Sequence, residues 1–173
     1  TQIVSILPYR KAKGGEPRKV TMQYQRDGSL LSFHYEYLLK SEITPCWSVR
    51  GGGKMLPKIS TITGGVEDNN ALEAAINELE EETGYKVKAK DLVFLGLCYA
   101  SKSSDTLYYL YTTDLTGKRK GKATGDGSAL EAQSKAVWKL EKDILACYDP
   151  LASVDFLRLK DHLDHPRSKT THM

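Results

Sequence analysis

Alternating apolar and polar positions predict that the first third of the chain is mostly β-structure. Stretches rich in β-branched and aromatic residues at a period of two lie at 3–10, 19–25 and 32–39. Turn-forming residues separate these stretches, and Asp27-Gly28 is typical of a hairpin tip. Between residues 47 and 70 glycines punctuate the chain, so we expect only one short strand there, at 58–62.

The next segment has the three-four spacing of an amphipathic helix. Its apolar positions are Leu72, Ala75, Ile76 and Leu79. Asn70 suits the N-cap, and Gly84 suits the C-terminal stop. We therefore predict a helix over 71–83.

The second half of the chain returns to strands and ends in helices. Two apolar stretches at 92–100 and 106–113 flank a polar turn and predict a hairpin. We expect a further strand carrying Trp138, at 136–140, and then two short helices separated by Asp149-Pro150. The pattern predicts a mixed α/β fold with a single domain over 1–165 and a disordered tail over 166–173.

Composition indicates more about the cellular compartment than about the function. The 173 residues carry a formal charge of +3, which supports only a modest attraction to anionic ligands. No apolar run approaches the roughly 18 residues of a membrane span, and no charged leader precedes the first apolar stretch. Three widely spaced cysteines favour a reducing compartment over a disulfide framework. We expect a soluble, cytoplasmic protein that does not engage membranes.

The predicted helix carries an unusual number of carboxylates. At about 100° per residue, Glu78, Glu81 and Glu82 share an arc beside the buried stripe, whereas Glu73 and Glu80 point away and are expected to face solvent. Like charges at this spacing, at the negative end of the helix dipole, destabilise the helix by a few tenths of a kcal/mol per pair. A bound Mg²⁺ or Mn²⁺ would offset the repulsion, and a merely solvated acidic face is the alternative.

A wider motif favours the metal. The stretch TGGVEDNNALEAAINELEEETGY resembles the Nudix box, which it matches in register at Glu78, Leu79, Glu81, Glu82, Gly84 and Tyr85. Two charged positions of the box depart from it: its Arg falls on Asn77 and its first Glu on Asn69. Its first Gly falls on Thr63, unless Gly64 takes that role. Asn69 and Asn77 can hydrogen-bond each other, although more weakly than an ion pair.

The resemblance implies a fold and a chemistry. It implies a Nudix fold, with a mixed β-sheet sandwiched between helices and a layout similar to that of ADP-ribose pyrophosphatases. Nudix enzymes split a pyrophosphate by attack of water on phosphorus with a divalent metal. By this resemblance Glu78 and Glu82 are principal metal ligands and catalytic residues, and Glu81 is a further ligand. The general base would come from a loop carboxylate after the box, with Glu131 the first choice and Asp126 the second. The alternative for Glu131 is that it only begins a helix or strand.

Several residues near the box are candidates for substrate binding. Arg50 and Lys54 flank three glycines and could reach phosphates, as could the backbone at Gly64 and Gly65; an ordinary surface loop is the alternative. Trp47 could stack on a base or belong to the core. The basic run at 118–122 is either a solvated loop or a contact for RNA or phosphates.

Three functional hypotheses follow. The favoured one is a metal-dependent pyrophosphohydrolase acting on a small nucleotide such as ADP-ribose. The second, prompted by Asn69 and Asn77, is a catalytically weak or silent nucleotide-binding module. The third is hydrolysis of an RNA cap or 5′ end through the basic run, and RNA is a less favoured partner than a small molecule. A homodimer is compatible with the sequence, which does not fix the oligomeric state.

Overall fold

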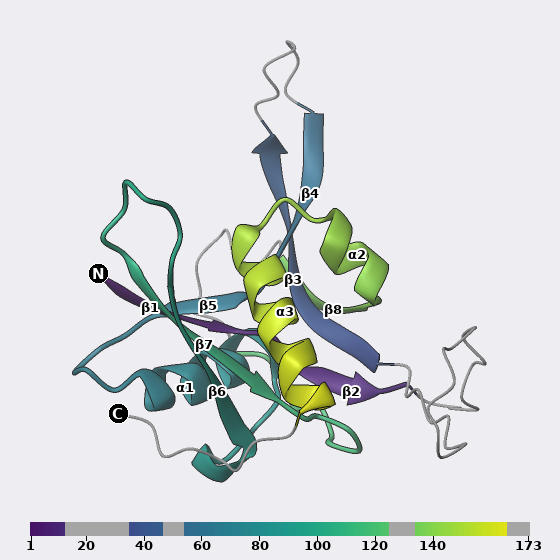
Figure 1. Ribbon diagram of the computed structural model, residues 1–173. Coiled ribbons are helices and arrows are strands. Elements are labelled where there is room, and N and C mark those ends of the chain that lie inside the picture. Colours follow the sequence, from purple (N-terminus) through teal and green to yellow (C-terminus); the bar gives the residue numbers. More distant parts are fainter. Residues whose placement is uncertain (13–34, 47–53, 125–133, 166–173) are drawn as a thin grey trace, which may run out of the picture.

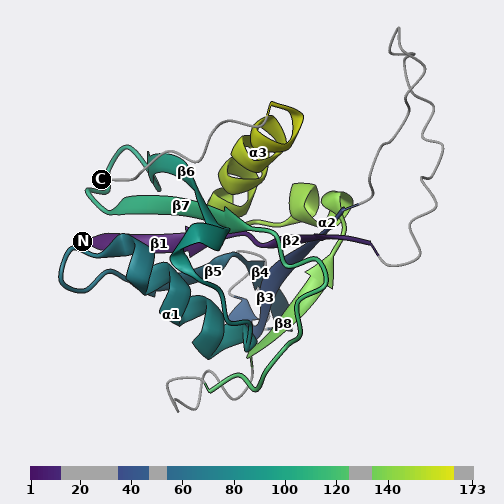
Figure 2. The same ribbon diagram turned by 90° about the horizontal axis from the view of Figure 1, so that it is seen from below.

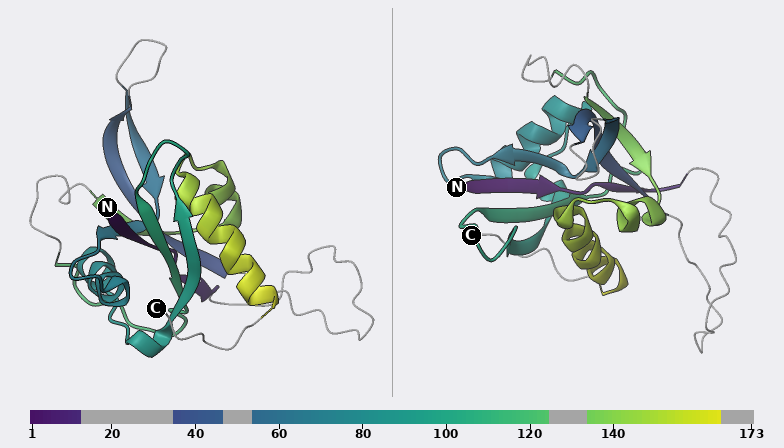
Figure 3. Two further views of the ribbon diagram at one scale, coloured as in Figure 1. Left: turned by 60° about the vertical axis from the view of Figure 1, so that its left-hand side comes forward. Right: turned by 90° about the horizontal axis from the view of Figure 1, so that it is seen from above.

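The computed structural model describes residues 1–12, 35–46, 54–124 and 134–165. Helices cover both sides of a β-structure: α1 (Ala71–Thr83) lies on one side, and α3 (Pro150–Asp164) lies on the other, with the short α2 (Glu141–Ala146) beside it (Figures 1 and 3). This is the mixed sheet between helices that the sequence predicts. Among the described residues, none of the helices has the length and apolarity needed to cross a bilayer.

The first of two sheets is mixed. Its order is β5 (Ile62–Gly65), β1 (Gln2–Ile6), β7 (Leu107–Thr113) and β6 (Leu92–Tyr99). Strand β1 runs antiparallel to β5 and parallel to β7, whereas β6 and β7 form the predicted hairpin. The register places Val4 opposite Gly64, so the end of β5 enters the loop before α1 at a fixed position.

The second sheet is antiparallel and is built around β3 (Tyr35–Cys46). One edge of β3 pairs with β2 (Tyr9–Lys11) and β4 (Lys54–Ser60), and the other pairs with β8 (Ser134–Lys139). Strand β8 carries Trp138, as expected. A short 3-10 turn, η1 (Ala89–Asp91), which the sequence pattern does not predict, joins α1 to β6.

Two apolar clusters hold the helices against the sheets. Ala75 and Leu79 of α1 pack with Val4, Ile6 and Leu38, whereas Phe156 and Leu159 of α3 pack with Leu7, Tyr37 and Leu39. The three consecutive residues Tyr37, Leu38 and Leu39 are all buried because successive side chains of a strand point to opposite faces and both faces are covered.

Two of the expected strands are wrong in the same way. The predicted strand 3–10 is divided between β1 and β2, because Pro8 has no N–H to continue a ladder and its carbonyl instead accepts a bond from the N–H of Leu38 in the other sheet. The predicted strand 58–62 is likewise divided, with β4 beginning at Lys54 and β5 starting after Thr61. The glycine-punctuated region therefore contains more regular structure than we expect from sequence.

The other predicted elements are either confirmed or lie outside the described residues. The helix 71–83, the 92–113 hairpin and the two helices split at Asp149-Pro150 are confirmed, and β3 extends to Cys46, beyond the predicted 32–39. The strand predicted at 19–25, the Asp27-Gly28 turn and the tail 166–173 lie outside the described residues.

Candidate functional site

Helix α1 is fixed at both ends by residues that the sequence identifies. The side-chain oxygen of Asn70 accepts a bond from the N–H of Glu73 at 3.0 Å, while its amide donates to the Glu73 carboxylate at 3.1 Å. At the other end Gly84 has φ 80°, and its N–H donates to the carbonyl of Glu80 at 2.8 Å. A side chain at Gly84 would also collide with the backbone of Gly121. The caps therefore set the rotation of the carboxylates on α1.

Glu78 lies directly over Gly64. A Cβ atom placed on Gly64 would overlap Cγ, Cδ and Oε1 of Glu78, whereas one placed on Gly65 would meet nothing within 4 Å. The absence of a side chain at Gly64 therefore gives Glu78 its place against β5. Gly64, one of the two candidate positions for the first glycine of the box, thus lies next to the Glu78 carboxylate.

The Glu82 side chain contacts a cation from β3. Nζ of Lys40 lies 3.0 Å from Oε1 of Glu82 and 2.8 Å from Oε1 of Glu42. The side chains of Lys40 and Glu82 are only 14% and 8% exposed, so this pair is shielded from solvent. Burial lowers the pKa of Lys40, but the hydrogen bonds to Glu42 and Glu82 outweigh that effect and leave the pKa raised.

Glu81 and Glu78 line a hollow of about 250 Å³ between α1 and the loop that precedes it. The hollow contains carboxylates, two asparagines and no basic side chain among its described lining residues: Gly65, Glu67, Asp68, Asn70, Glu73, Ala74, Asn77, Glu78 and Glu81. The expectation that Glu73 merely faces solvent is therefore incomplete, because its exposed carboxylate both caps the helix and lines this hollow. Glu80, as expected, is away from it and pairs with exposed Lys86 at 3.6 Å.

Asn69 and Asn77 do not form the hydrogen bond that the sequence allows. Asn69 is exposed with φ 55°, a left-handed conformation that Asn tolerates well, and Asn77 lines the hollow. The structure describes both residues and places no hydrogen bond between them. The loop before α1 is instead closed by a backbone bond from Asn70 to the carbonyl of Glu67 at 3.1 Å.

The remaining site candidates are only partly described. Trp47, Arg50, Asp126 and Glu131 lie outside the described residues, and Lys54 opens β4, with its backbone paired to Cys46. Gly65 lines the hollow. The sequence does not single out Lys40, because the predicted strand 32–39 ends one residue before it. The signal that could have found it is a lysine directly after the apolar pair Leu38-Leu39 and two residues from Glu42, a spacing that puts both charged side chains on one face of a strand.

The carboxylates have the right chemistry for a hard cation, although they do not converge. In the described part of the chain, no group of three or more His, Cys, Asp or Glu side chains is arranged to hold a metal ion. Carboxylate oxygens are nevertheless the ligands that Mg²⁺ and Mn²⁺ prefer. The Lys40 ammonium against Glu82 shows that positive charge is stabilised on this side of α1. Glu78, Glu81 and Glu82 therefore fit a divalent cation by donor type.

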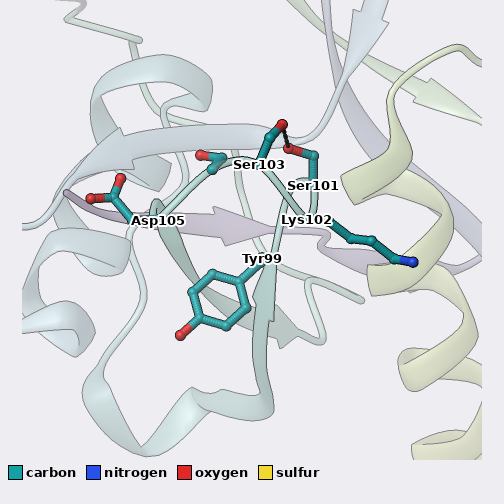
Figure 4. A pocket seen from close by; sticks show the side chains of 6 residues that line it. Tyr99, Ser101, Lys102, Ser103 and Asp105 are labelled. Carbon is teal, nitrogen blue, oxygen red and sulfur yellow. Dashed lines mark hydrogen bonds between the residues drawn. The ribbon is translucent and has the colours of Figure 1, made fainter.

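A second hollow, of about 790 Å³, lies at the turn between β6 and β7 (Figure 4). Its described lining residues all belong to that hairpin, and the hydroxyls of Ser101 and Ser103 bond each other at 3.2 Å rather than pointing to a common centre. It shares no lining residue with the α1 hollow. The carboxylate helix is the stronger candidate for chemistry.

Comparisons with known proteins agree with this geometry. The sequence profile of the NUDIX domain matches residues 38–146. A Nudix protein from Listeria monocytogenes is similar in structure, with a TM-score of 0.60, 18% identity and 99% of each chain covered. An Ap4A hydrolase of C. elegans has a TM-score of 0.56 at 15% identity, covering 94% of this chain and 97% of that one.

A third similar structure is the NUDIX domain of Shewanella oneidensis NrtR in complex with ADP ribose. Its TM-score is 0.56 at 10% identity, with 94% of this chain and 87% of that chain covered. At these identities the structural likeness establishes the fold alone. No match was found among curated protein sequences.

Proposed function

Because the chain belongs to the NUDIX domain family, we propose that it is a metal-dependent hydrolase of a nucleoside diphosphate linked to another group. ADP-ribose-like molecules are the favoured substrates. The similar structures support this class, since one is an Ap4A hydrolase and another is held in complex with ADP ribose. Both ligands carry phosphate chains attached to adenosine.

The observation that carries the proposal is the charge of the α1 hollow. Five of its described lining residues are acidic and none is basic. Such a hollow repels a pyrophosphate by itself, and it accepts one only after a cation has neutralised the carboxylates. A divalent metal at Glu78 and Glu81 of the hollow, with the neighbouring Glu82 of α1 as the third proposed ligand, would supply that neutralisation and would lower the pKa of the attacking water.

The chain's own residues would hold these carboxylates in place. Gly64 leaves room for Glu78, and Lys40 fixes one oxygen of Glu82. Asn77 stands where the box has a cation, and Lys40 of β3 places a positive charge against Glu82. Glu131 remains the proposed general base, and Arg50, Lys54 and Trp47 the proposed substrate contacts.

A substrate panel tests the proposal. Purified protein with Mg²⁺ or Mn²⁺ should release nucleoside monophosphate from ADP-ribose or from a related nucleoside diphosphate, followed by ³¹P NMR. Glu82→Gln should abolish that release, whereas Glu80→Gln on the same turn should not. If no nucleoside diphosphate sugar, dinucleotide or nucleoside triphosphate is turned over with either metal, the proposed activity is wrong.

A binding module is the second candidate, favoured by the unbridged Asn69 and Asn77. It predicts saturable binding of ADP-ribose in calorimetry without turnover. The paired change Asn69→Glu with Asn77→Arg restores both box charges and should switch on hydrolysis in an otherwise silent protein. Because residue 69 is left-handed, Asn69→Glu alone should cost about 1 kcal/mol of stability, which urea unfolding would detect.

A further inference from the structure

Two basic segments meet at the C-terminal end of α1. The first, 86–90, follows Gly84, and the second, 118–122, follows β7 (Figure 2). The N–H of Gly121 donates to the carbonyl of Gly84 at 2.8 Å, and Nζ of Lys118 lies 3.1 Å from Oδ2 of Asp91. Segments about thirty residues apart in sequence are thus joined directly beyond the acidic turn of α1, the C-terminal turn that carries Glu80, Glu81 and Glu82.

The two segments form one surface of concentrated positive charge. This basic surface consists of Lys86, Lys88, Lys90, Lys118, Arg119, Lys120 and Lys122, all of them exposed. Asp91 is the one acidic residue within the two connecting stretches, 84–91 and 115–124, whereas the whole chain has a formal charge of only +3. These two stretches therefore carry more net positive charge than the whole chain does.

Most of this charge is available to a partner. Lys86 pairs with Glu80 at 3.6 Å, and Lys118 pairs with Asp91. Lys88, Arg119, Lys120 and Lys122 form no ion pair with any described residue. Exposed ion pairs contribute little to stability, and unpaired cations held side by side repel one another. The arrangement is thus explained better by an anionic partner than by the stability of the fold.

The surface presents cations without apolar area. Tyr85, Val87 and Leu115 are at most 8% exposed, so the alternation along 85–88 puts Lys86 and Lys88 outside and the apolar side chains inside. A protein partner or an inserting membrane helix would need apolar contact area, which these segments lack. A chain of phosphates needs only closely spaced cations.

We propose that the basic surface binds the phosphate backbone of a nucleic-acid strand, a binding site beyond the proposed hydrolysis of a small nucleotide. Its cations contact phosphates, and no aromatic ring is exposed in the described segments 84–91 and 115–124 on which a base could stack. Binding is therefore independent of base sequence and depends strongly on salt. A nucleic-acid strand bound to the basic surface extends towards the C-terminal turn of α1. The bound polymer therefore lies close to the carboxylates of α1.

Fluorescence anisotropy tests the proposal by measuring RNA affinity at several KCl concentrations. The probe is a labelled single-stranded RNA of about 20 nucleotides without a 5′ pyrophosphate. The parent should show a linear fall of log affinity with log KCl. The variant Arg119→Gln, Lys120→Gln, Lys122→Gln should bind at least about tenfold more weakly at low salt, and its slope should be shallower by about 2, since each single-strand phosphate contributes about 0.7.

A matched variant controls for bulk charge. Lys102→Gln, Lys142→Gln, Lys160→Gln removes three exposed cations elsewhere and should leave RNA affinity within about twofold of the parent. Lys86→Gln, Lys88→Gln, Lys90→Gln should weaken binding as the other basic triple does, because both segments belong to one surface. Equal affinity in all variants, or parent protein that binds phosphatidylserine vesicles but not RNA, would overturn the proposal. Hydrolysis of the small nucleotide is measured in a separate assay. A failure of the proposed hydrolysis can therefore be told apart from a failure of the proposed RNA binding.

Discussion

Nζ of Lys40 lies 3.0 Å from Oε1 of Glu82 and thereby joins β3 to the acidic turn of α1. Lys40→Met would leave Glu82 and Glu42 next to each other without their shared cation. We expect a loss of about 1–3 kcal/mol in the free energy of unfolding at pH 7, because the Glu82 carboxylate stays shielded from solvent. Urea unfolding measures it.

Lys86→Met is the matched control for this change, since its pair with Glu80 is exposed. It should cost no more than about 0.5 kcal/mol. Lys40→Arg should recover part of the lost stability. If Lys40→Met and Lys86→Met were equally stable, the Lys40 contact would be unimportant.

A methyl group at Gly64 would displace Glu78. Gly64→Ala should lower kcat/KM by about 100-fold if Glu78 has its proposed catalytic role, because a shift of about 1 Å in a catalytic group can cost that factor. Gly65→Ala, whose methyl meets no other atom, should lower it much less and leave stability within about 0.5 kcal/mol. Steady-state kinetics of the two variants compares them, and equal losses would mean that contact with Glu78 is not the reason for Gly64.

Substitutions at Gly84 and Gly117 distinguish the backbone strain of a side chain at positive φ from its steric clash with neighbouring atoms. Both have positive φ, 80° and 75°, but only Gly84 lies against the backbone of Gly121. Gly117→Ala should cost about 1 kcal/mol from the left-handed backbone alone. Gly84→Ala should cost at least about 1 kcal/mol more, and chemical denaturation of both should show that difference.

Asp155 is fully buried on α3, where Oδ2 accepts a bond from the Ser5 hydroxyl at 2.9 Å. Burial raises the pKa of Asp155 well above its usual value, only partly offset by the Ser5 bond. A raised pKa in the folded state means that its contribution to stability is full below the unfolded pKa of about 3.9 and is lost as the pH rises through the folded value.

Asp155→Asn should therefore stabilise the protein above neutral pH, by about 1–3 kcal/mol, and have little effect near pH 4. Thermal unfolding across this pH range measures the difference. Exposed Asp105→Asn should show no such pH dependence. Were Asp155→Asn destabilising at every pH, the charged carboxylate would be a favourable part of the fold.

The sequence predicts the helix of the site well and its surroundings less well. Asn70, Gly84 and the apolar stripe of α1 are local signals, so the bounds 71–83 follow from neighbouring residues alone. The division of β1 from β2 at Pro8 depends instead on which sheet receives each strand. The Lys40 contact is also long-range, because it joins residues 42 positions apart. No periodicity in one segment can reveal either.

Manganese binding tests the central claim that the α1 carboxylates hold a divalent cation. Electron paramagnetic resonance of Mn²⁺ should show one bound ion in the parent, with affinity reduced at least about tenfold by Glu78→Gln or Glu82→Gln. Glu80→Gln, two residues from each of these positions on the same helix, should leave the affinity unchanged. No bound ion at millimolar manganese, or equal affinities for Glu82→Gln and Glu80→Gln, would contradict the account.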